Sequence, residues 1–245
     1  MAIEGSSGEF TKYRDRGAYH WREASRHLLD GWPYTRSRIE WVVRQCAASR
    51  RVLEIGCGDA ALLARVARPD VEVTGVDSDE TALKLARELF AQGGLRGEFH
   101  DDLGAVKGEK FDTVILAEVI EHVDDAEALL AQIVDLLSEG RRLVLTTPVR
   151  TLERSPDAHH VHEYWPGELQ DFVARYFQDV RLTRMHPAWF VDLMCFGTGR
   201  VRPFAMLANL VRLTTSIELI DKVTSPLGLF WTQGVVGTGP RRVRE

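Results

Sequence analysis

A regular alternation of short apolar runs with longer helical patterns occupies the middle of this 245-residue chain. The apolar runs span residues 51–55, 71–76, 97–100, 111–116 and 142–147, and the helical patterns span 60–67, 80–92 and 126–137. Strands and helices that alternate in such short steps form a parallel sheet with helices on both faces. The nearly continuous apolar runs VLEI, VTGV and TVIL suit strands that are buried on both sides. The sequence therefore predicts an α/β fold.

Further segments flank this alternation. Residues 1–10 are small and polar and are expected to form a flexible tail. Residues 11–50 have helical patterns on either side of Trp32-Pro33 and are expected to form an N-terminal helical cap. After the fifth run, the sequence predicts a helix at 166–176 and strands at 179–185 and 229–237.

The stretch of residues 188–227 separates the last two predicted strands. It is too long for a simple connection and too apolar for a solvated loop. We expect it to form two helices that pack over the sheet edge or act as a lid. The predicted core therefore comprises 51–187 and 228–240, with 188–227 as a helical insertion.

Composition excludes several classes of protein. Apolar residues make up 44% of the chain and charged residues 27%, which excludes a disordered or collagen-like chain. Cys46, Cys57 and Cys195 are far apart and form no CxxC pair, which argues against a zinc ribbon or a disulfide framework and suits a reducing compartment. No apolar run reaches the roughly 18–20 residues that a membrane span needs, and the first residues lack the apolar stretch of a secretory signal. We therefore expect a cytoplasmic protein, and the net charge of −5 argues against holding nucleic acid by bulk charge.

The first strand runs directly into a glycine turn with the sequence EIGCGDA, residues 54–60. Glycines let the backbone approach a ligand closely, and the start of the following helix presents free N–H groups. The full dinucleotide fingerprint GxGxxG is absent, because Ala61 occupies its last position. Glu54 before the turn disfavours a pyrophosphate and suits a ligand that carries positive charge.

Acidic residues also end the second and third strands. Asp77 follows Gly58 by nineteen residues, where a carboxylate can accept hydrogen bonds from two ribose hydroxyls. Asp101 and Asp102 follow the third strand, where an adenine amino group would lie. The inferred ligand has an adenosine, no phosphates and a cationic group.

Together, EIGCG, the acid at Asp77, the Asp101/Asp102 pair and the run FDTVILAEVIEH resemble class I S-adenosylmethionine-dependent methyltransferases of the methyltransferase-11/23 type. The resemblance covers about residues 51–185, with a last strand near 230–236. It implies a Rossmann-like sheet of seven strands, the last of them antiparallel. It also implies an enzyme with S-adenosylmethionine as its cofactor.

The resemblance implies a set of cofactor contacts. Glu54, Gly56 and Gly58 would contact the amino-acid end, Asp77 the ribose, and Asp101 or Asp102 with Leu103 the adenine. The neighbouring residues Cys57, Ser78, Ala117 and Glu118 complete the expected contacts, with Cys57 as a small turn residue that has no catalytic role. The alternative interpretation is that the two glycines only make a tight turn and Asp77 only caps a helix.

The fourth strand ends in the motif E-x-x-E-H, which places Glu118, Glu121 and His122 at the carboxyl edge of the sheet, beside the cofactor. A later run, HHVHEY, adds His159, His160 and His162. Two carboxylates and two imidazoles would make a site for Mg²⁺ or Mn²⁺. This pattern is similar to ubiquinone-biosynthesis O-methyltransferases and to small-RNA 3′-terminal 2′-O-methyltransferases. Aligning Tyr164 with the aromatic residue of the RNA group makes His160 the matching ligand, although a shift of register would exchange it for His159 or His162.

The alternative to a metal site is that Glu118 orients the substrate and that Glu121 and His122 cap the following helix. Without a metal, His160 would be a general base or a loop hydrogen-bond donor. Glu118, His122 and His160 are the candidate catalytic residues. The chain departs from the RNA group after the histidine, and HVHEY also resembles the H-V-x-E-Y segment of many small-molecule methyltransferases.

Three hypotheses about function follow. The first is O-methylation of a small or lipid-like acceptor such as a vicinal diol, a catechol or a saccharide, with or without a divalent metal. The second is 2′-O-methylation of an RNA 3′ end, and the third is an inactive binding module. Apolar residues at helical spacing in 203–223 would allow a shallow membrane contact, with simple packing on the sheet as the alternative. Near the start of the chain, Tyr13, Tyr19 or Trp21 is expected to lie near the cofactor, with helix surface and packing as the alternative.

Overall fold

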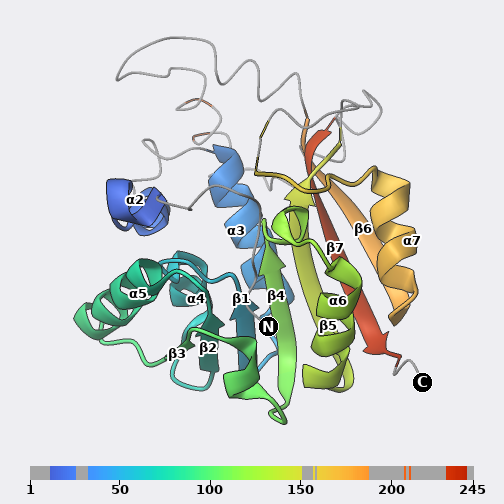
Figure 1. The fold of residues 1–245 in the computed structure, drawn as a ribbon. Coiled ribbons are helices and arrows are strands. Elements are labelled where there is room, and N and C mark those ends of the chain that lie inside the picture. The colour runs from blue at the N-terminus through green and yellow to red at the C-terminus, as the bar shows by residue number, and fades with distance from the viewer. Residues whose placement is uncertain are drawn as a thin grey trace.

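Seven strands form one mixed sheet in the computed structural model of the protein, shown in Figure 1. The structure describes residues 12–25, 33–150, 157, 159–187, 207, 210 and 230–241. The strands are β1 (Arg51–Ile55), β2 (Glu72–Val76), β3 (Glu98–His100), β4 (Phe111–Ala117), β5 (Leu137–Pro148), β6 (Phe177–Pro187) and β7 (Phe230–Pro240). Their order across the sheet is β3-β2-β1-β4-β5-β7-β6, with β3 at one edge and β6 at the other.

Strand direction follows the predicted pattern. The pairs β1·β2, β1·β4, β2·β3 and β4·β5 are parallel, whereas β7 runs antiparallel between β5 and β6. The antiparallel direction of the last strand is therefore confirmed. The connection that follows β1 lies on one face of the sheet, and the connection that follows the neighbouring strand β4 lies on the other. In open α/β sheets, ligands bind at the carboxyl ends of such a pair of strands.

Helices cover both faces of the sheet. One face carries α3 (Pro33–Gln45), α4 (Ala61–Val66) and α5 (Glu80–Gln92), and the other carries α6 (Ala126–Leu136) and α7 (Pro166–Ala174). Successive residues of a strand enter opposite cores: Val114 and Leu116 pack with the α6 and α7 side, and Ile115 packs with the α3 side. This burial on both faces explains the continuous apolar runs.

The N-terminal cap differs from the prediction in one respect. The helical pattern before Trp32 is split into α1 (Lys12–Arg16) and α2 (Tyr19–Ser25). Gly17 lies between them with a φ of +58°, a left-handed conformation that ends the first helix. The other predicted elements agree with the structure to within a few residues, apart from β5, which begins at Leu137 rather than 142.

Several predictions fall outside the described residues. They concern the tail at 1–10, nearly all of the insertion at 188–227 and the proposed membrane contact at 203–223. Leu207 and Leu210 are described there, and both side chains are exposed. The division into domains stays a prediction. Within the described ranges, each helix is too short or too polar to cross a bilayer.

Candidate functional site

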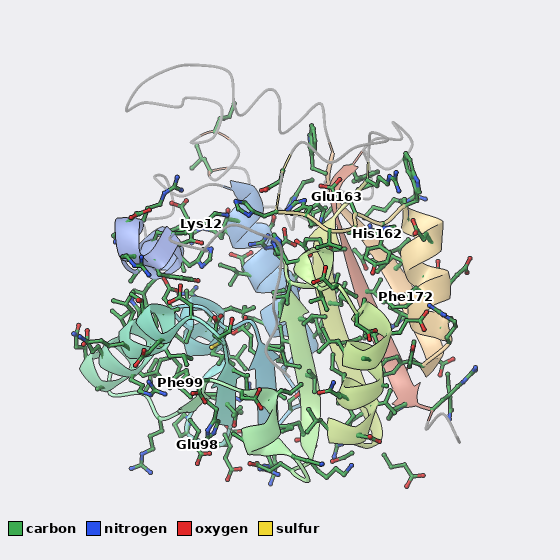
Figure 2. The ribbon with its side chains drawn as sticks, viewed as in Figure 1. Lys12, Glu98, Phe99, His162, Glu163 and Phe172 are labelled. Atoms are coloured by element: carbon green, nitrogen blue, oxygen red, sulfur yellow. The ribbon has the colours of Figure 1, made fainter. Side chains whose placement is uncertain are left out.

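A cleft of about 1070 Å³ opens at the carboxyl ends of β1, β2 and β4. Its floor comes from the ends of these strands, and its cover comes from α1, α2 and α3. In Figure 2 the labelled side chains of Lys12 and Glu163 lie at this end of the sheet. The predicted site residues Glu54, Gly56, Cys57, Asp77, Ser78, Ala117, Glu118, Glu121, His122 and His160 all line the cleft.

The glycine turn after β1 needs both of its glycines. Gly56 and Gly58 have φ values of +72° and +53°. A Cβ atom on Gly56 would lie 2.4 Å from Val119, and one on Gly58 would lie 1.8 Å from the hydroxyl of Tyr13. The turn therefore depends on glycine for conformation and for space, and Tyr13 of the cap lies directly over it.

Asp77 directly follows β2, and its side chain contacts the glycine turn. Its carboxylate accepts hydrogen bonds from the backbone N–H groups of Gly58 (2.7 Å) and Asp79 (2.9 Å). The cap of α5 is Asp79, whose carboxylate accepts from the N–H of Ala82. The interpretation of Asp77 as only a helix cap is therefore wrong, because Asp79 has that role.

Three acidic side chains, Glu54, Asp59 and Asp77, lie in this half of the cleft. Burial raises the pKa of Glu54 well above its usual range, and the nearby carboxylates of Asp59 and Asp77 raise it further. Burial also raises the pKa values of Asp59 and Asp77. The Oε2 atom of Glu54 is buried and has no hydrogen-bond partner among the described residues. A buried, unsatisfied carboxylate beside two others suits a ligand that brings a positive charge.

The predicted adenine contacts lie away from this lining. Asp101, Asp102 and Leu103 are not among the residues that line the cleft. Asp102 accepts a hydrogen bond from the N–H of Gly104 and caps the short helix η1 (Leu103–Val106), and Leu103 is buried in the core. Their contact with a cofactor stays a prediction.

Glu118, the first acid of E-x-x-E-H, has a partner that the sequence does not reveal. Its Oε2 atom lies 2.7 Å from Nη1 of Arg38 in α3, and both side chains are a quarter exposed. Its other oxygen, Oε1, is buried and has no hydrogen-bond partner among the described residues. Glu118 also has a φ of +56°, an uncommon conformation for a non-glycine residue that turns the chain as it leaves β4.

The rest of the motif forms a compact cluster with one histidine of the later run. Glu121, His122 and His160 each offer a ligand atom, and these atoms lie within 4.8 Å of one another. Glu118 does not belong to this cluster. The structure thus brings together three of the four predicted metal ligands.

The polar partners of the cluster hold its groups in place. A carboxylate oxygen of Glu121 accepts a hydrogen bond from the hydroxyl of Thr147 (2.9 Å). Burial, and then the charge of Glu118, raises the pKa of Glu121 to about 8. His122 donates from Nδ1 to the backbone carbonyl of His159 (2.9 Å), and burial lowers its pKa, so the neutral ring is favoured.

Backbone hydrogen bonds fix which histidine enters the cluster. The N–H groups of Val161 and His162 both donate to the carbonyl oxygen of Glu121, which joins the later run to the short helix η2 (Ile120–His122). The ring of His162 instead lies 2.7 Å from Glu168 in α7. Of the three histidines in the run, His160 is therefore the one that lies with Glu121 and His122, as the alignment on Tyr164 predicts.

The capping alternative for E-x-x-E-H is wrong. The cap of α6 is Asp125, whose carboxylate accepts from the N–H of Ala128 at 2.9 Å. Glu121 and His122 instead make the contacts described above, away from the start of that helix. Their side chains are therefore available to the cleft.

The cap contributes contacts that sequence patterns indicate only in part. Tyr13 is buried over the glycine turn, and its hydroxyl lies 2.9 Å from Nδ1 of His20. Tyr13 and Tyr19 line the cleft, and their contact with a cofactor stays a prediction. The roles of Arg38, Asp59 and Thr147 were missed, because each depends on a partner far away in the sequence. The role of Glu163 was missed although its partner His160 lies only three residues before it.

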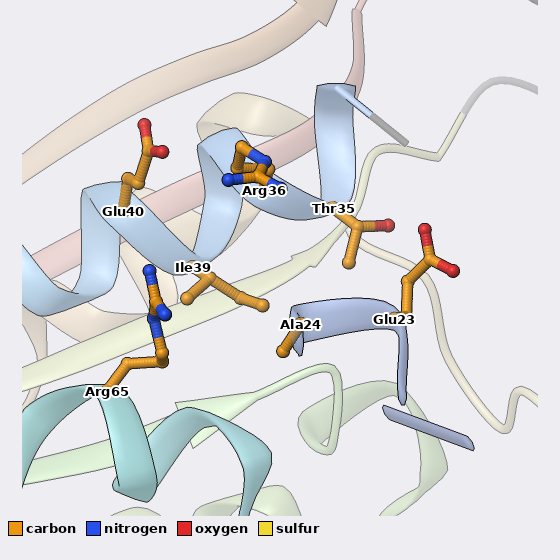
Figure 3. A pocket seen from close by; sticks show the side chains of 7 residues that line it. All are labelled: Glu23, Ala24, Thr35, Arg36, Ile39, Glu40 and Arg65. Carbon is orange, nitrogen blue, oxygen red and sulfur yellow. The ribbon is translucent and has the colours of Figure 1, made fainter. Parts of the chain in front are cut away.

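A second, much smaller cavity lies between α2, α3 and α4 (Figure 3). Its volume is about 20 Å³, and it is lined by Glu23, Ala24, Thr35, Arg36, Ile39, Glu40 and Arg65. A cavity of this size holds about one water molecule. It does not compete with the main cleft as a ligand site.

Comparison with known proteins gives a consistent picture. A family model described as "Methyltransferase domain" matches residues 18–189. The ubiquinone biosynthesis O-methyltransferase of Aromatoleum aromaticum is 28% identical over 152 residues, which cover 60% of this chain and 64% of that protein. The ubiquinone biosynthesis O-methyltransferase of Xanthomonas euvesicatoria is 35% identical over 119 residues, which cover 46% of this chain and 50% of that protein. The chain thus spans between half and two thirds of the length of these relatives.

Solved structures share the fold. An S-adenosylmethionine-dependent methyltransferase from Archaeoglobus fulgidus superimposes with a TM-score of 0.59 at 19% identity, over 93% of this chain and 97% of that one. Phosphoethanolamine N-methyltransferase 2 of Haemonchus contortus, in complex with S-adenosylmethionine, gives a TM-score of 0.64 at 16% identity, over 95% of this chain and 59% of that one. At such identities the likeness concerns the fold alone.

Proposed function

Because a single family model covers most of it, the chain belongs to the methyltransferase-domain family, and we propose that it transfers a methyl group from S-adenosylmethionine to a hydroxyl of a small or lipid-like acceptor. The observation that carries this proposal is the buried Oε2 atom of Glu54, which has no hydrogen-bond partner among the described residues and lies in the same cleft as Gly56 and Asp77. The sequence relatives are named as O-methyltransferases, which supports oxygen as the methylated atom.

The residues present suit S-adenosylmethionine. Its ammonium group would pair with Glu54, its ribose hydroxyls with Asp77, and its amino-acid end would lie against Gly56 and Gly58. The cofactor would supply a methyl group already activated by a sulfonium. The protein then has to align the acceptor and remove its proton.

The second half of the proposal concerns that proton. A hydroxyl is a poor nucleophile near neutral pH, so its proton must be taken up or its pKa lowered. Glu121, His122 and His160 would hold a divalent cation such as Mg²⁺ or Mn²⁺, which lowers the pKa of a bound hydroxyl and orients it. The imidazole of His122 or of His160 would serve as the proton acceptor if no cation binds.

The charge of the cleft favours a small acceptor over an RNA end. Carboxylates predominate in its lining: Glu54, Asp59, Asp77, Asp79, Glu80, Glu118, Glu121 and Asp157, against Lys12, Arg14 and Arg38 among the permanently charged bases. The negatively charged phosphodiester backbone of RNA would be repelled by this lining. A ribose 3′ end, with its vicinal hydroxyls, is therefore an alternative outcome of the test rather than the expected one.

The test combines binding with transfer. Calorimetry with S-adenosylhomocysteine should show binding to the wild type, a large loss in Glu54→Gln, and none in the control Glu72→Gln, which alters an exposed carboxylate outside the cleft. Methyl-labelled S-adenosylmethionine, incubated with diols, catechols, saccharides and an RNA 3′ end, should label a hydroxyl of a small molecule. Absence of cofactor binding would overturn the proposal. Binding without transfer to any acceptor would favour the inactive module.

A further inference from the structure

Glu163 is a buried carboxylate that the proposed reaction does not use. It lies between the histidine run and Tyr164, and its side chain is only 7% exposed. Its Oε1 atom is 2.6 Å from Nδ1 of His160, whose side chain is 12% exposed. A short contact between two such buried polar groups is strong, because little water competes for either partner.

This contact determines which nitrogen of His160 is protonated. When Glu163 is ionised its carboxylate can only accept, and Nδ1 of His160 then carries the hydrogen and donates it to Glu163. In the neutral ring Nε2 then has the lone pair, which is the atom that binds a cation or takes a proton. His122 is arranged in the same way, since its Nδ1 donates to the carbonyl of His159.

We infer that Glu163 is the positioning residue of His160, which it orients so that Nε2 acts in the cleft. What Nε2 of His160 binds depends on the proposed function. The orientation of the ring depends only on the contact between His160 and Glu163. A carboxylate behind a histidine ligand fixes the ring and raises its basicity, and its loss typically costs roughly 10–100-fold in metal affinity.

Two neighbouring carboxylates sharpen the inference. Asp157, which lines the cleft, lies 3.8 Å from Nε2 of His160, so a doubly protonated ring between two acids is the competing arrangement. Glu168 makes a 2.7 Å contact with His162 outside the cleft, where both side chains are about 40% exposed. The pair His162 and Glu168 therefore serves as a control for His160 and Glu163, because it makes a similar contact outside the cleft.

The experiment reads the ring nitrogens directly. Nitrogen-15 correlation spectra of histidine-labelled protein, with His160 assigned by its loss in His160→Gln, should show the wild-type ring as the neutral form with hydrogen on Nδ1. Glu163→Ala should lose this form, Glu163→Gln should keep it because the amide oxygen still accepts, and Glu168→Ala should leave it unchanged. A doubly protonated wild-type ring, or an unchanged ring in Glu163→Ala, would overturn the inference.

Binding of Mn²⁺ alone, followed by electron paramagnetic resonance, gives a second readout that does not require turnover. We expect Glu163→Ala to weaken Mn²⁺ binding by about 10–100-fold, with recovery in Glu163→Gln and no change in Glu168→Ala. Wild-type affinity in Glu163→Ala would contradict the positioning role. If the wild type binds no Mn²⁺, the cation part of the proposed function fails, and the spectra alone decide the role of Glu163.

Discussion

The backbone N–H of Trp21 in α2 donates a hydrogen bond to Oδ2 of Asp59 in the glycine turn, at 3.0 Å. Asp59 is fully buried and also accepts from the N–H of Ala61. One carboxylate therefore connects the N-terminal cap to the start of α4. The cap and the proposed cofactor turn should respond together to changes at this position.

Replacing Asp59 tests this connection. Asp59→Ala leaves the Trp21 N–H without its acceptor, so we expect a loss of about 1–3 kcal/mol in the free energy of unfolding and weaker binding of S-adenosylhomocysteine. Urea unfolding and calorimetry measure the two effects. The control Asp70→Ala removes an exposed carboxylate paired with Arg68 and should change stability by less than about 0.5 kcal/mol. Equal stabilities of the two variants would contradict the connection.

Gly58 offers a test of the close approach between cap and turn. Gly58→Ala introduces a Cβ where the Tyr13 hydroxyl lies, so Tyr13 must move away and S-adenosylhomocysteine affinity should fall at least tenfold. In the control Gly94→Ala, the replaced glycine has a similar φ of +64° but open space around it. Only the unfavourable backbone conformation then lowers the free energy of unfolding, by about 1 kcal/mol. Adding Tyr13→Ala to Gly58→Ala should recover part of the stability. No recovery would mean that the strain is in the backbone and not in the contact.

Most of the fold could be predicted because its signals are local. The continuous apolar strands, the glycine turn at Gly56 and Gly58, and the helix at 80–92 each follow from adjacent residues. The break at Gly17 was missed because one glycine inside a helical pattern is compatible with either a kink or an end. The direction of the last strand came from the resemblance to a family and not from any residue.

The site could be predicted only where the chain follows the sheet. Strand ends meet at one edge, so Glu54, Asp77 and Glu121 could be placed in one cleft. Arg38 carries no motif, and its role arises from a contact with a residue that approaches it only in the folded protein. Glu163 belongs to the run HVHEY, but the run does not show that its side chain contacts His160. The exclusion of Glu118 from the histidine cluster has the same origin, because Arg38 approaches it from α3.

The ion pair between Arg38 and Glu118 should contribute measurably to stability. A double-mutant cycle with Arg38→Met and Glu118→Gln should give a coupling energy of about 1 kcal/mol, because both groups are largely shielded from water. The pair Arg175 and Glu127 has a similar separation, 2.8 Å against 2.7 Å, but is more than half exposed, so its cycle should give less than about 0.5 kcal/mol. Similar coupling in both pairs would show that burial does not strengthen the first.

Removal of divalent metal tests the role of the cluster. We expect EDTA to abolish turnover, added Mn²⁺ or Mg²⁺ to restore it, and Glu121→Ala to mimic the chelator, because the cluster then loses its only carboxylate. His162→Ala should remain fully sensitive to EDTA and active with metal, since His162 contacts Glu168 instead. Full activity in the chelator would reject the metal while leaving methyl transfer in place.

The buried carboxylate of Glu54 makes stability depend on pH in a direction that can be worked out. Its folded pKa is raised above the unfolded value of about 4.5, so above that pH the unfolded chain gives up a proton that the folded chain keeps. The free energy of unfolding of the ligand-free protein should therefore fall as pH rises from about 4.5 towards the folded pKa. Glu54→Gln should show a shallower fall, because Asp59 and Asp77, whose pKa values are also raised, still contribute.

Ligand binding should show the opposite trend at the same residue. An ammonium group pairs with the ionised form of Glu54, so S-adenosylhomocysteine should stabilise the wild type increasingly as pH rises through this window, and Glu54→Gln should lose that increase. Thermal unfolding with and without the ligand at several pH values measures both trends. A wild type whose stability rises with pH in the absence of ligand, or a Glu54→Gln variant that keeps the full gain from the ligand, would show that Glu54 is not the group that receives the cationic end of the cofactor.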